Sequence, residues 1–158
     1  MPRESKGEKG MLYQAKNGTL SIEDTTMEYI RFGTGKETMI MLPGLGDGLR
    51  TMKGTALPMA AMYRCFTKDY TVYAFSRRNV IPEGFTTRDM AEDVCFAMEA
   101  LGIEKAHVMG VSMGGMIAQH LAADHPEKVE KLVLVVTCHK PNPIMISGLL
   151  QWKEYALQ

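Results

Sequence analysis

Short apolar blocks and longer amphipathic segments alternate along this chain, and they predict strands and helices in turn. Runs rich in β-branched and aromatic residues predict buried strands, whereas apolar residues spaced three and four apart predict helices. The expected strands are residues 26–32, 38–42, 70–75, 106–111 and 131–137. The expected helices are residues 57–67, 87–101 and 113–124. Alternation from about residue 38 to 137 predicts an α/β fold, a doubly wound, mostly parallel sheet with helices on both faces.

Some element boundaries carry signals of their own. Asn17-Gly18 is a strong hairpin signal between two segments of strand-like sequence. Thr86 or Thr87 is suited to cap the N-terminus of the second expected helix, and Gly102 is suited to follow its last turn. We therefore expect the chain to reverse first at Asn17-Gly18 and the second helix to stop just before Gly102.

The segment Gly110-Val111-Ser112-Met113-Gly114 matches G-x-S-x-G and joins an expected strand to an expected helix. A turn of this sharpness forces strained backbone angles on the serine, and Gly110 and Gly114 remove side chains that would clash. The Ser112 hydroxyl is then expected above the sheet, at a helix N-terminus that favours developing negative charge. The alternative is a serine that only caps a helix, with glycines present for packing.

A second glycine-rich segment, Leu42-Pro43-Gly44-Leu45-Gly46, follows the expected strand 38–42. Acyl transfer puts negative charge on a carbonyl oxygen, and two backbone N–H groups aimed at that oxygen stabilise it. We expect these two donors at Leu45 and Met113. The alternative is a dinucleotide-binding turn, because residues 44–49 resemble G-x-G-x-x-G, although Leu49 stands where the last glycine belongs.

In their order and spacing, residues 38–137 resemble the N-terminal core of the α/β-hydrolase superfamily. The matching segments are MIMLPGLGDG, YTVYAFSRRN, TTRDMAEDVCFAMEALGI and KAHVMGVSMGGMIAQHLAADHPEKVEKLVLVVT. The resemblance implies that Ser112 is the nucleophile and that Leu45 and Met113 form the oxyanion hole. The sequence departs from the family pattern at Pro43-Gly44, where His-Gly is common. Because the oxyanion donor is a backbone group, this departure affects the support of the loop rather than the donor itself.

The partners that would activate the serine are not found in the sequence. In this fold the catalytic residues follow the order Ser, then Asp or Glu, then His, and no residues after Ser112 match that pair. His139 is the histidine expected nearest the active end of the sheet, but it lacks an orienting carboxylate. His107 begins the elbow strand at the opposite end and is expected to be structural. The pair Arg77-Arg78 is expected in a solvated loop or against a cap.

The resemblance therefore implies an α/β-hydrolase fold that is truncated at its C-terminus. Residues 1–137 would form the N-terminal part of the core, and residues 138–158 would begin a cap or lid segment. The strand at 131–137 is almost continuously apolar, as expected of a strand covered on both faces of a parallel sheet. Without a next neighbour it would leave an exposed edge, and we expect self-association through that edge.

Composition removes several classes of function. Eighteen basic residues balance 18 acidic ones, so nothing favours binding to nucleic acid or to an anionic membrane. The charged N-terminus lacks the apolar stretch of a signal peptide, and the longest aliphatic run is far shorter than the roughly 20 residues that cross a bilayer. The three cysteines are scattered and lack metal-ligand spacing. We expect a cytoplasmic protein with neither metal nor cofactor.

The sequence thus predicts a serine hydrolase of the α/β-hydrolase type. Its substrate would be a small ester, thioester, amide or related acyl compound, cleaved through an acyl-enzyme on Ser112, with an active site that is incomplete in this chain. Two alternatives stay open. One is a non-catalytic or truncated hydrolase-like module, and the other is a dinucleotide-binding protein.

Overall fold

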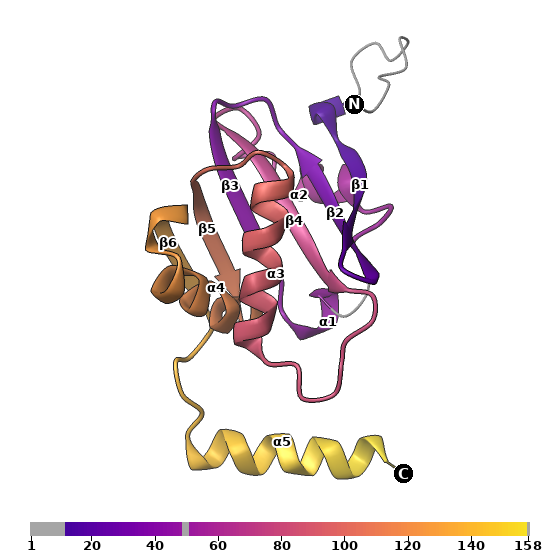
Figure 1. Cartoon of the computed structure of the whole chain (residues 1–158), viewed down its shortest axis with the longest axis vertical. Coiled ribbons are helices and arrows are strands. Elements are labelled where there is room, and N and C mark those ends of the chain that lie inside the picture. The colour runs from indigo at the N-terminus through magenta and orange to yellow at the C-terminus, as the bar shows by residue number, and fades with distance from the viewer. Residues whose placement is uncertain (1–11, 49–50, 158) are drawn as a thin grey trace.

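The computed structural model describes residues 12–48 and 51–157, and its body is a six-stranded sheet with helices on both faces (Figure 1). The strands are β1 Lys16–Ile22, β2 Thr25–Phe32, β3 Glu37–Leu42, β4 Tyr70–Arg78, β5 Ala106–Val111 and β6 Val129–Val135. The helices are α1 Leu45–Gly48, α2 Ala56–Met62, α3 Thr87–Ala100, α4 Met113–Asp124 and α5 Pro143–Ala156, with short 3-10 turns η1 Leu12–Gln14 and η2 Pro126–Lys128. Leu49, the residue that breaks the dinucleotide pattern, lies outside the described residues.

The strands are ordered β1-β2-β4-β3-β5-β6 across the sheet. The pairs β1–β2 and β2–β4 are antiparallel, whereas β4, β3, β5 and β6 run parallel to one another. The carboxyl ends of these four parallel strands therefore lie along one edge of the sheet, which is where open α/β sheets bind their ligands. The predicted fold class is confirmed.

The strand β3 shows how this sheet builds two cores. Its successive side chains point to opposite faces, as the strand geometry requires. Ile40 and Leu42 are fully buried in the core that also contains residues of α3 and α4. Met39 and Met41 are buried on the other face, in the core that contains residues of α2. Both faces of β3 are therefore closed, and its carboxyl end is held firmly in the middle of the sheet.

The first reversal of the chain is not where the sequence predicted it. Asn17-Gly18 lies inside β1, and the turn to β2 is formed by Glu23 and Asp24, with Glu23 at a positive φ of 49°. Gly18 pairs with Tyr29 of β2, and a Cβ at Gly18 would lie only 2.2 Å from the Tyr29 ring. The glycine thus makes room for an aromatic ring across the hairpin rather than for a turn.

The predicted elements between residues 86 and 124 match the structure closely. Strand β5 and helix α4 have the predicted bounds, and α3 ends one residue earlier than expected. Thr86 caps α3 through a reciprocal capping box with Asp89, and Gly102 follows with a positive φ of 68°. By contrast, α2 ends at Met62, five residues earlier than predicted, and β4 continues past the predicted end to Arg78.

The last strand differs from its prediction. β6 lies at the edge of the sheet, and its apolar side chains are partly exposed, with Val133 48% exposed. Helix α4 contacts β6, but no strand of the described residues pairs with its outer edge. The apolar run is therefore not covered on both faces, and the exposed edge is the one that the sequence predicted. Its hydrophobic run matches a covered strand, but the covering elements are not supplied by residues 12–48 and 51–157.

Helix α5 follows β6 after a short segment that contains Pro141. It begins at Pro143, where the Asn142 side chain accepts a hydrogen bond from the Met145 N–H. In Figure 1 it lies apart from the sheet, on the side toward which β5 points. Several of its apolar side chains are exposed, including Ile144 at 84% and Trp152 at 68%. Among the helices of the described residues, none has the length and apolarity needed to cross a bilayer.

Candidate active site

Ser112 occupies the sharp turn between β5 and α4. Its backbone has φ 52° and ψ −119°, a conformation that costs energy for any residue other than glycine. A nucleophile elbow requires such a strained turn to hold the serine above the sheet. The Ser112 side chain makes no capping hydrogen bond to α4. Helix capping therefore does not explain this serine.

The backbone of Ser112 is held by β6 and by the residues that follow it. The Ser112 N–H donates to the Val135 carbonyl at 2.9 Å. The Ser112 carbonyl accepts from the Thr137 hydroxyl at 2.7 Å and from the Gly115 N–H at 2.9 Å. The N–H and the carbonyl of Ser112 are thus both hydrogen-bonded to β6 or to Thr137, which follows it. These bonds hold the strained turn from the β6 side of β5.

Three glycines let the chain pack closely around the elbow. A Cβ at Gly110 would lie 2.5 Å from the Gly114 carbonyl oxygen, and one at Gly114 would lie 2.0 Å from the Leu42 carbonyl oxygen. A Cβ at Gly115 would lie 2.6 Å from the Thr137 side chain. Real Cβ atoms do not approach backbone this closely, so a side chain at Gly110 or Gly114 would clash with the chain around the turn.

The loop after β3 lies directly against the elbow. A Cβ at Gly44 would contact the Ser112 Cβ at 3.4 Å and its Oγ at 3.9 Å. Leu45 follows as the first residue of α1, and Met113 is the first residue of α4. The N–H groups of first-turn residues have no partner within their own helix. The structure thus brings Ser112, Leu45 and Met113 together at one edge of the sheet.

Arg77 and Arg78 are not solvated, and that expectation is wrong. The two residues are only 5% and 8% exposed. Arg78 forms a two-point ion pair with Asp93 of α3, with Nε–Oδ2 at 2.8 Å and Nη2–Oδ1 at 2.5 Å. It also contacts Glu23 at 3.0 Å and covers the Phe85 ring. The hydrogen bonds that Arg78 donates to the Asp93 carboxylate hold the pKa of Arg78 above its usual range.

Sequence reasoning also missed the contact of Arg77. Its Nη2 donates to the Pro43 carbonyl at 2.8 Å, at the start of the glycine-rich loop. Burial lowers the pKa of Arg77 to about 10, and the charge of Asp93 opposes that change. A signal for the neighbouring pair was present, because Asp93 falls among the apolar residues on the buried face of α3. No comparable signal pointed to Pro43, because its partner atom belongs to the backbone.

Two features thus meet at the carboxyl edge of the parallel sheet: a serine at a strained strand-to-helix turn and a glycine-rich loop that packs against it. A family model described as the alpha/beta hydrolase fold matches residues 37–156. The chain belongs to the α/β-hydrolase family.

Relatives of this α/β hydrolase have several names. A protein of Caulobacter vibrioides named "Putative carbamate hydrolase RutD" is 32% identical over 115 residues, which are 69% of this chain and 40% of that protein. A protein of Mycobacterium tuberculosis named "Putative non-heme bromoperoxidase BpoC" is 39% identical over 107 residues, 66% of this chain and 39% of that protein. This chain therefore spans about 40% of the length of the curated relatives it matches.

Solved structures of longer proteins also match this chain over only part of their own length. The crystal structure of a hydrolase from Pseudomonas aeruginosa superposes with a TM-score of 0.70 at 25% sequence identity. The match covers 88% of this chain and 51% of that one. Almost the whole of this α/β hydrolase therefore has a counterpart in about half of a longer hydrolase.

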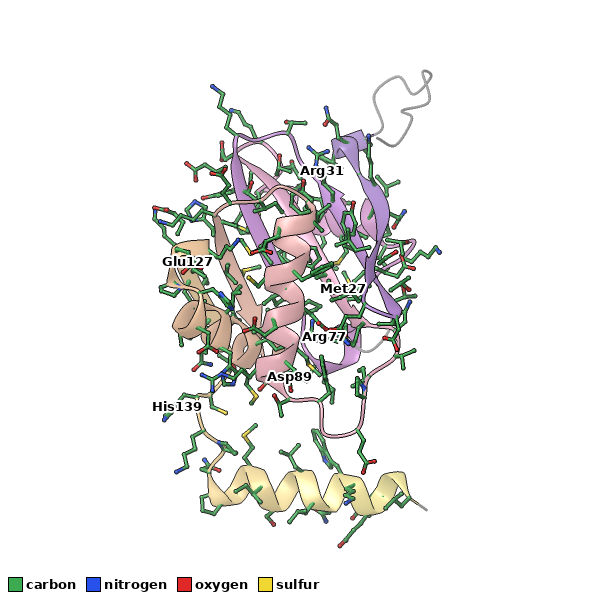
Figure 2. All side chains as sticks on the ribbon, viewed as in Figure 1. Met27, Arg31, Arg77, Asp89, Glu127 and His139 are labelled. Atoms are coloured by element: carbon green, nitrogen blue, oxygen red, sulfur yellow. The ribbon has the colours of Figure 1, made fainter. Side chains whose placement is uncertain are left out.

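Two histidines of the described residues, His107 and His139, make no hydrogen bond to the Ser112 hydroxyl. His107 is hydrogen-bonded to Glu37 at 2.8 Å and packs edge-on against Tyr70, at the amino ends of the parallel strands. His139 is exposed in the segment between β6 and α5 (Figure 2). Within residues 12–48 and 51–157, no histidine or carboxylate forms a hydrogen bond with the Ser112 hydroxyl. The described residues therefore unite the serine with its two N–H neighbours but not with a base.

Proposed function

We propose that this α/β hydrolase cleaves small ester, thioester, amide or related acyl substrates through an acyl-enzyme on Ser112. The observation that carries the proposal is the backbone of Ser112, with φ 52° and ψ −119° at the turn between β5 and α4. Strain of this kind persists only where the surrounding structure enforces it, and it is concentrated at functional sites. The name of the Caulobacter relative, a carbamate hydrolase, supports a substrate with a carbonyl centre.

In the proposed reaction the Ser112 Oγ bonds to the substrate carbonyl carbon and its proton passes to a general base. The carbonyl oxygen becomes negatively charged and accepts hydrogen bonds from the N–H groups of Leu45 and Met113. The leaving group then departs with a proton, and water hydrolyses the acyl-enzyme to release the acid and restore Ser112. Loss of one oxyanion donor typically lowers turnover by roughly a hundredfold to a thousandfold, so both donors are essential to the proposal.

The general base is the part of the mechanism that the described residues do not provide. We infer that residues 1–137 carry the nucleophile and oxyanion half of the site, and that residues 138–158 begin a cap. The position of α5 on the side toward which β5 points supports a cap role for that segment. Without its base, a serine hydrolase retains a residual rate of roughly a thousandfold to ten-thousandfold over water.

A second candidate function is a hydrolase-like module that binds without catalysis. The observation that favours it is the Ser112 hydroxyl, which has no hydrogen-bonded histidine or carboxylate in the described part of the chain. The strained turn at Ser112 would then be a feature of the fold that takes no part in catalysis. Reactivity of Ser112 toward an electrophile separates the two candidates.

The test is covalent labelling with a fluorophosphonate probe over several hours, followed by mass spectrometry of the labelled peptide. We expect slow labelling at Ser112 and none in Ser112→Ala. Ser147→Ala is the matched control, because Ser147 is an exposed serine on α5 and its loss should leave labelling unchanged. Labelling that persists in Ser112→Ala would refute Ser112 as the nucleophile. A wild-type chain that never reacts would favour the non-catalytic module.

A further inference from the structure

Arg77 lies where the sheet meets the glycine-rich loop. It is the last residue but one of β4, which pairs with β3, and the helix α1 lies close to β4. Figure 2 shows Arg77 near the edge of the sheet at which α1 is found. The side chain reaches across the end of β3 and donates from Nη2 to the Pro43 carbonyl at 2.8 Å. It therefore joins β4 to the first residue of the loop that carries Leu45.

The burial of this guanidinium is costly for stability. Arg77 is 5% exposed, and its Nε is buried without a hydrogen-bond partner among the described residues. A buried donor without an acceptor destabilises a fold, because it loses its hydrogen bond to water and gains none in return. The two neighbouring residues of β4 are hydrogen-bonded, since Ser76 accepts from the Met52 N–H and Arg78 donates to Asp93. A charge retained at such a cost, with its hydrogen bond directed to the loop, indicates a role in holding that loop.

The Pro43 carbonyl is confined between two groups. Arg77 binds it from the β4 side, and the first turn of α4 lies against it, because a Cβ at Gly114 would be 2.6 Å from the Pro43 oxygen. Fixing this carbonyl fixes the plane of the Pro43–Gly44 peptide. That peptide ends at Gly44, which packs against Ser112, and the Leu45 N–H belongs to the following peptide. Fixing the Pro43–Gly44 plane therefore fixes the base from which the Leu45 N–H is placed.

The other side of the loop lacks close packing. A small hollow of about 80 Å³ lies there, and Pro43 and Gly44 are among the residues that line it. Side-chain packing from that direction therefore cannot set the loop position by itself. The polar contact from Arg77 and the close approach of Gly114 are the restraints on the Pro43 carbonyl. Their precision matters, because an error of 1 Å in the placement of a catalytic group lowers rates by about a hundredfold.

We propose that Arg77 is a positioning residue that orients the Pro43–Gly44 peptide and thereby aims the Leu45 N–H at the oxyanion. Its catalytic consequence rests on the proposed function of Ser112, whereas its structural consequence, a fixed loop, does not. Arg77 does not touch the substrate. It acts through one carbonyl of the loop, and the length and planarity of its guanidinium suit that reach better than a lysine ammonium does.

The test compares Arg77→Met and Arg77→Lys with the wild-type chain. Two quantities are measured: the maximal rate of Ser112 labelling by the fluorophosphonate, and the probe concentration that gives half that rate. Arg77→Met should lower the maximal rate by about tenfold to a hundredfold, as expected of a displaced catalytic donor, and change the half-saturating concentration less than twofold. The maximal labelling rate of Arg77→Lys should lie between those of the wild type and Arg77→Met, because lysine keeps a charged donor but has a shorter reach.

The matched control is Arg31→Met, which removes an arginine from β2, remote from the loop (Figure 2). It should label at the wild-type rate. An equal loss of labelling rate in Arg31→Met and Arg77→Met would overturn the proposal, since the loss would then follow from removing any arginine and not from the contact with Pro43. If Arg77→Met does not fold, Arg77→Lys decides, and wild-type behaviour of that variant would also overturn it.

A second readout separates this proposal from the proposed function. The amide resonances of Gly44 and Leu45 in ¹H–¹⁵N spectra should shift and broaden in Arg77→Met, while those of β2 remain unchanged. If wild-type Ser112 does not react at all, the proposed function fails, but these resonances still report whether Arg77 holds the loop. Unchanged Gly44 and Leu45 resonances in Arg77→Met would overturn the positioning role.

Discussion

The elbow strand β5 has two flanks that support Ser112 by different means. On one flank, β3 and β4 end in buried side chains, and Arg77 and Arg78 reach from β4 to the loop and to α3. On the other flank, β6 exposes its apolar side chains, with Val133 48% exposed. Yet β6 still holds the elbow, because the Val135 carbonyl accepts the hydrogen bond of the Ser112 N–H.

The difference teaches how a strained turn can be fixed by side chains on one side and by main chain on the other. The β4 flank depends on charged side chains that are expensive to bury and therefore need their partners. The β6 flank depends on backbone groups, which most side-chain substitutions leave in place. Side-chain changes should therefore be severe on the β4 flank and mild on the β6 flank, which three variants test in descending order of effect.

The largest effect is expected from Arg78→Met on the β4 flank. This change leaves the Asp93 carboxylate buried without its two-point partner, and the side chains of both residues are only 8% exposed. Breaking a buried ion pair in this way typically costs about 3–5 kcal/mol of unfolding free energy. Urea denaturation followed by circular dichroism measures it.

The control for Arg78→Met is Arg88→Met. Arg88 also forms a two-point pair, with Asp124, but its side chain is 63% exposed. Solvent screens exposed pairs, so this variant should be nearly as stable as the wild type. Equal losses in the two variants would contradict the view that burial makes the β4 flank sensitive.

A smaller effect is expected from Thr137→Val, which probes the one side chain of the β6 flank that binds the elbow. The variant loses the hydroxyl that donates to the Ser112 carbonyl at 2.7 Å, but that carbonyl keeps the Gly115 N–H. Because the acceptor is not left unsatisfied, the expected loss is about 1 kcal/mol in the same urea experiment.

Thr71→Val is the matched control for Thr137→Val. The Thr71 hydroxyl donates to the Gly35 carbonyl at 2.8 Å, far from the elbow. Both variants should lose similar stability, but only Thr137→Val should alter the rate at which Ser112 is labelled. Identical labelling in both would show that the Thr137 contact does not control the elbow.

The parts of the site that could be predicted depend on neighbours in sequence. The bounds of β5 and α4, and the serine between them, follow from a hydrophobic run, two glycines and a helix start within 19 residues. The capping box at Thr86 and Asp89 is equally local. Such signals remain interpretable because the interacting residues are close enough for their spacing to indicate their geometry.

The parts that could not be predicted depend on partners from distant segments. Gly18 was assigned to a turn because its role toward Tyr29 appears only when β1 and β2 are paired. Arg77 was expected in a solvated loop or against a cap, and its burial could not be foreseen because its acceptor is the Pro43 carbonyl, 34 residues earlier in the chain. The apolar run of β6 is typical of a covered strand, but whether it is covered depends on what packs against it and not on the strand itself.

The smallest effect on stability is expected from Val133→Lys in β6. The side chain is already half exposed, so the unfolding free energy should change by no more than about 0.5 kcal/mol. Its effect on association should be larger. We propose that the open edge of β6 pairs with a second copy of the chain, since exposed apolar edge strands favour such pairing and a lysine there opposes it.

Sedimentation velocity over a range of concentrations tests that pairing. The wild type should shift toward a dimer as the concentration rises, whereas Val133→Lys should remain monomeric. Ser21→Lys is the matched control, because it introduces the same charge at an exposed position of β1, the strand at the opposite edge. It should associate like the wild type. A wild type that stays monomeric throughout, or a Ser21→Lys variant that dissociates equally, would mean that the β6 edge is not the contact surface and that exposure alone does not distinguish the two flanks.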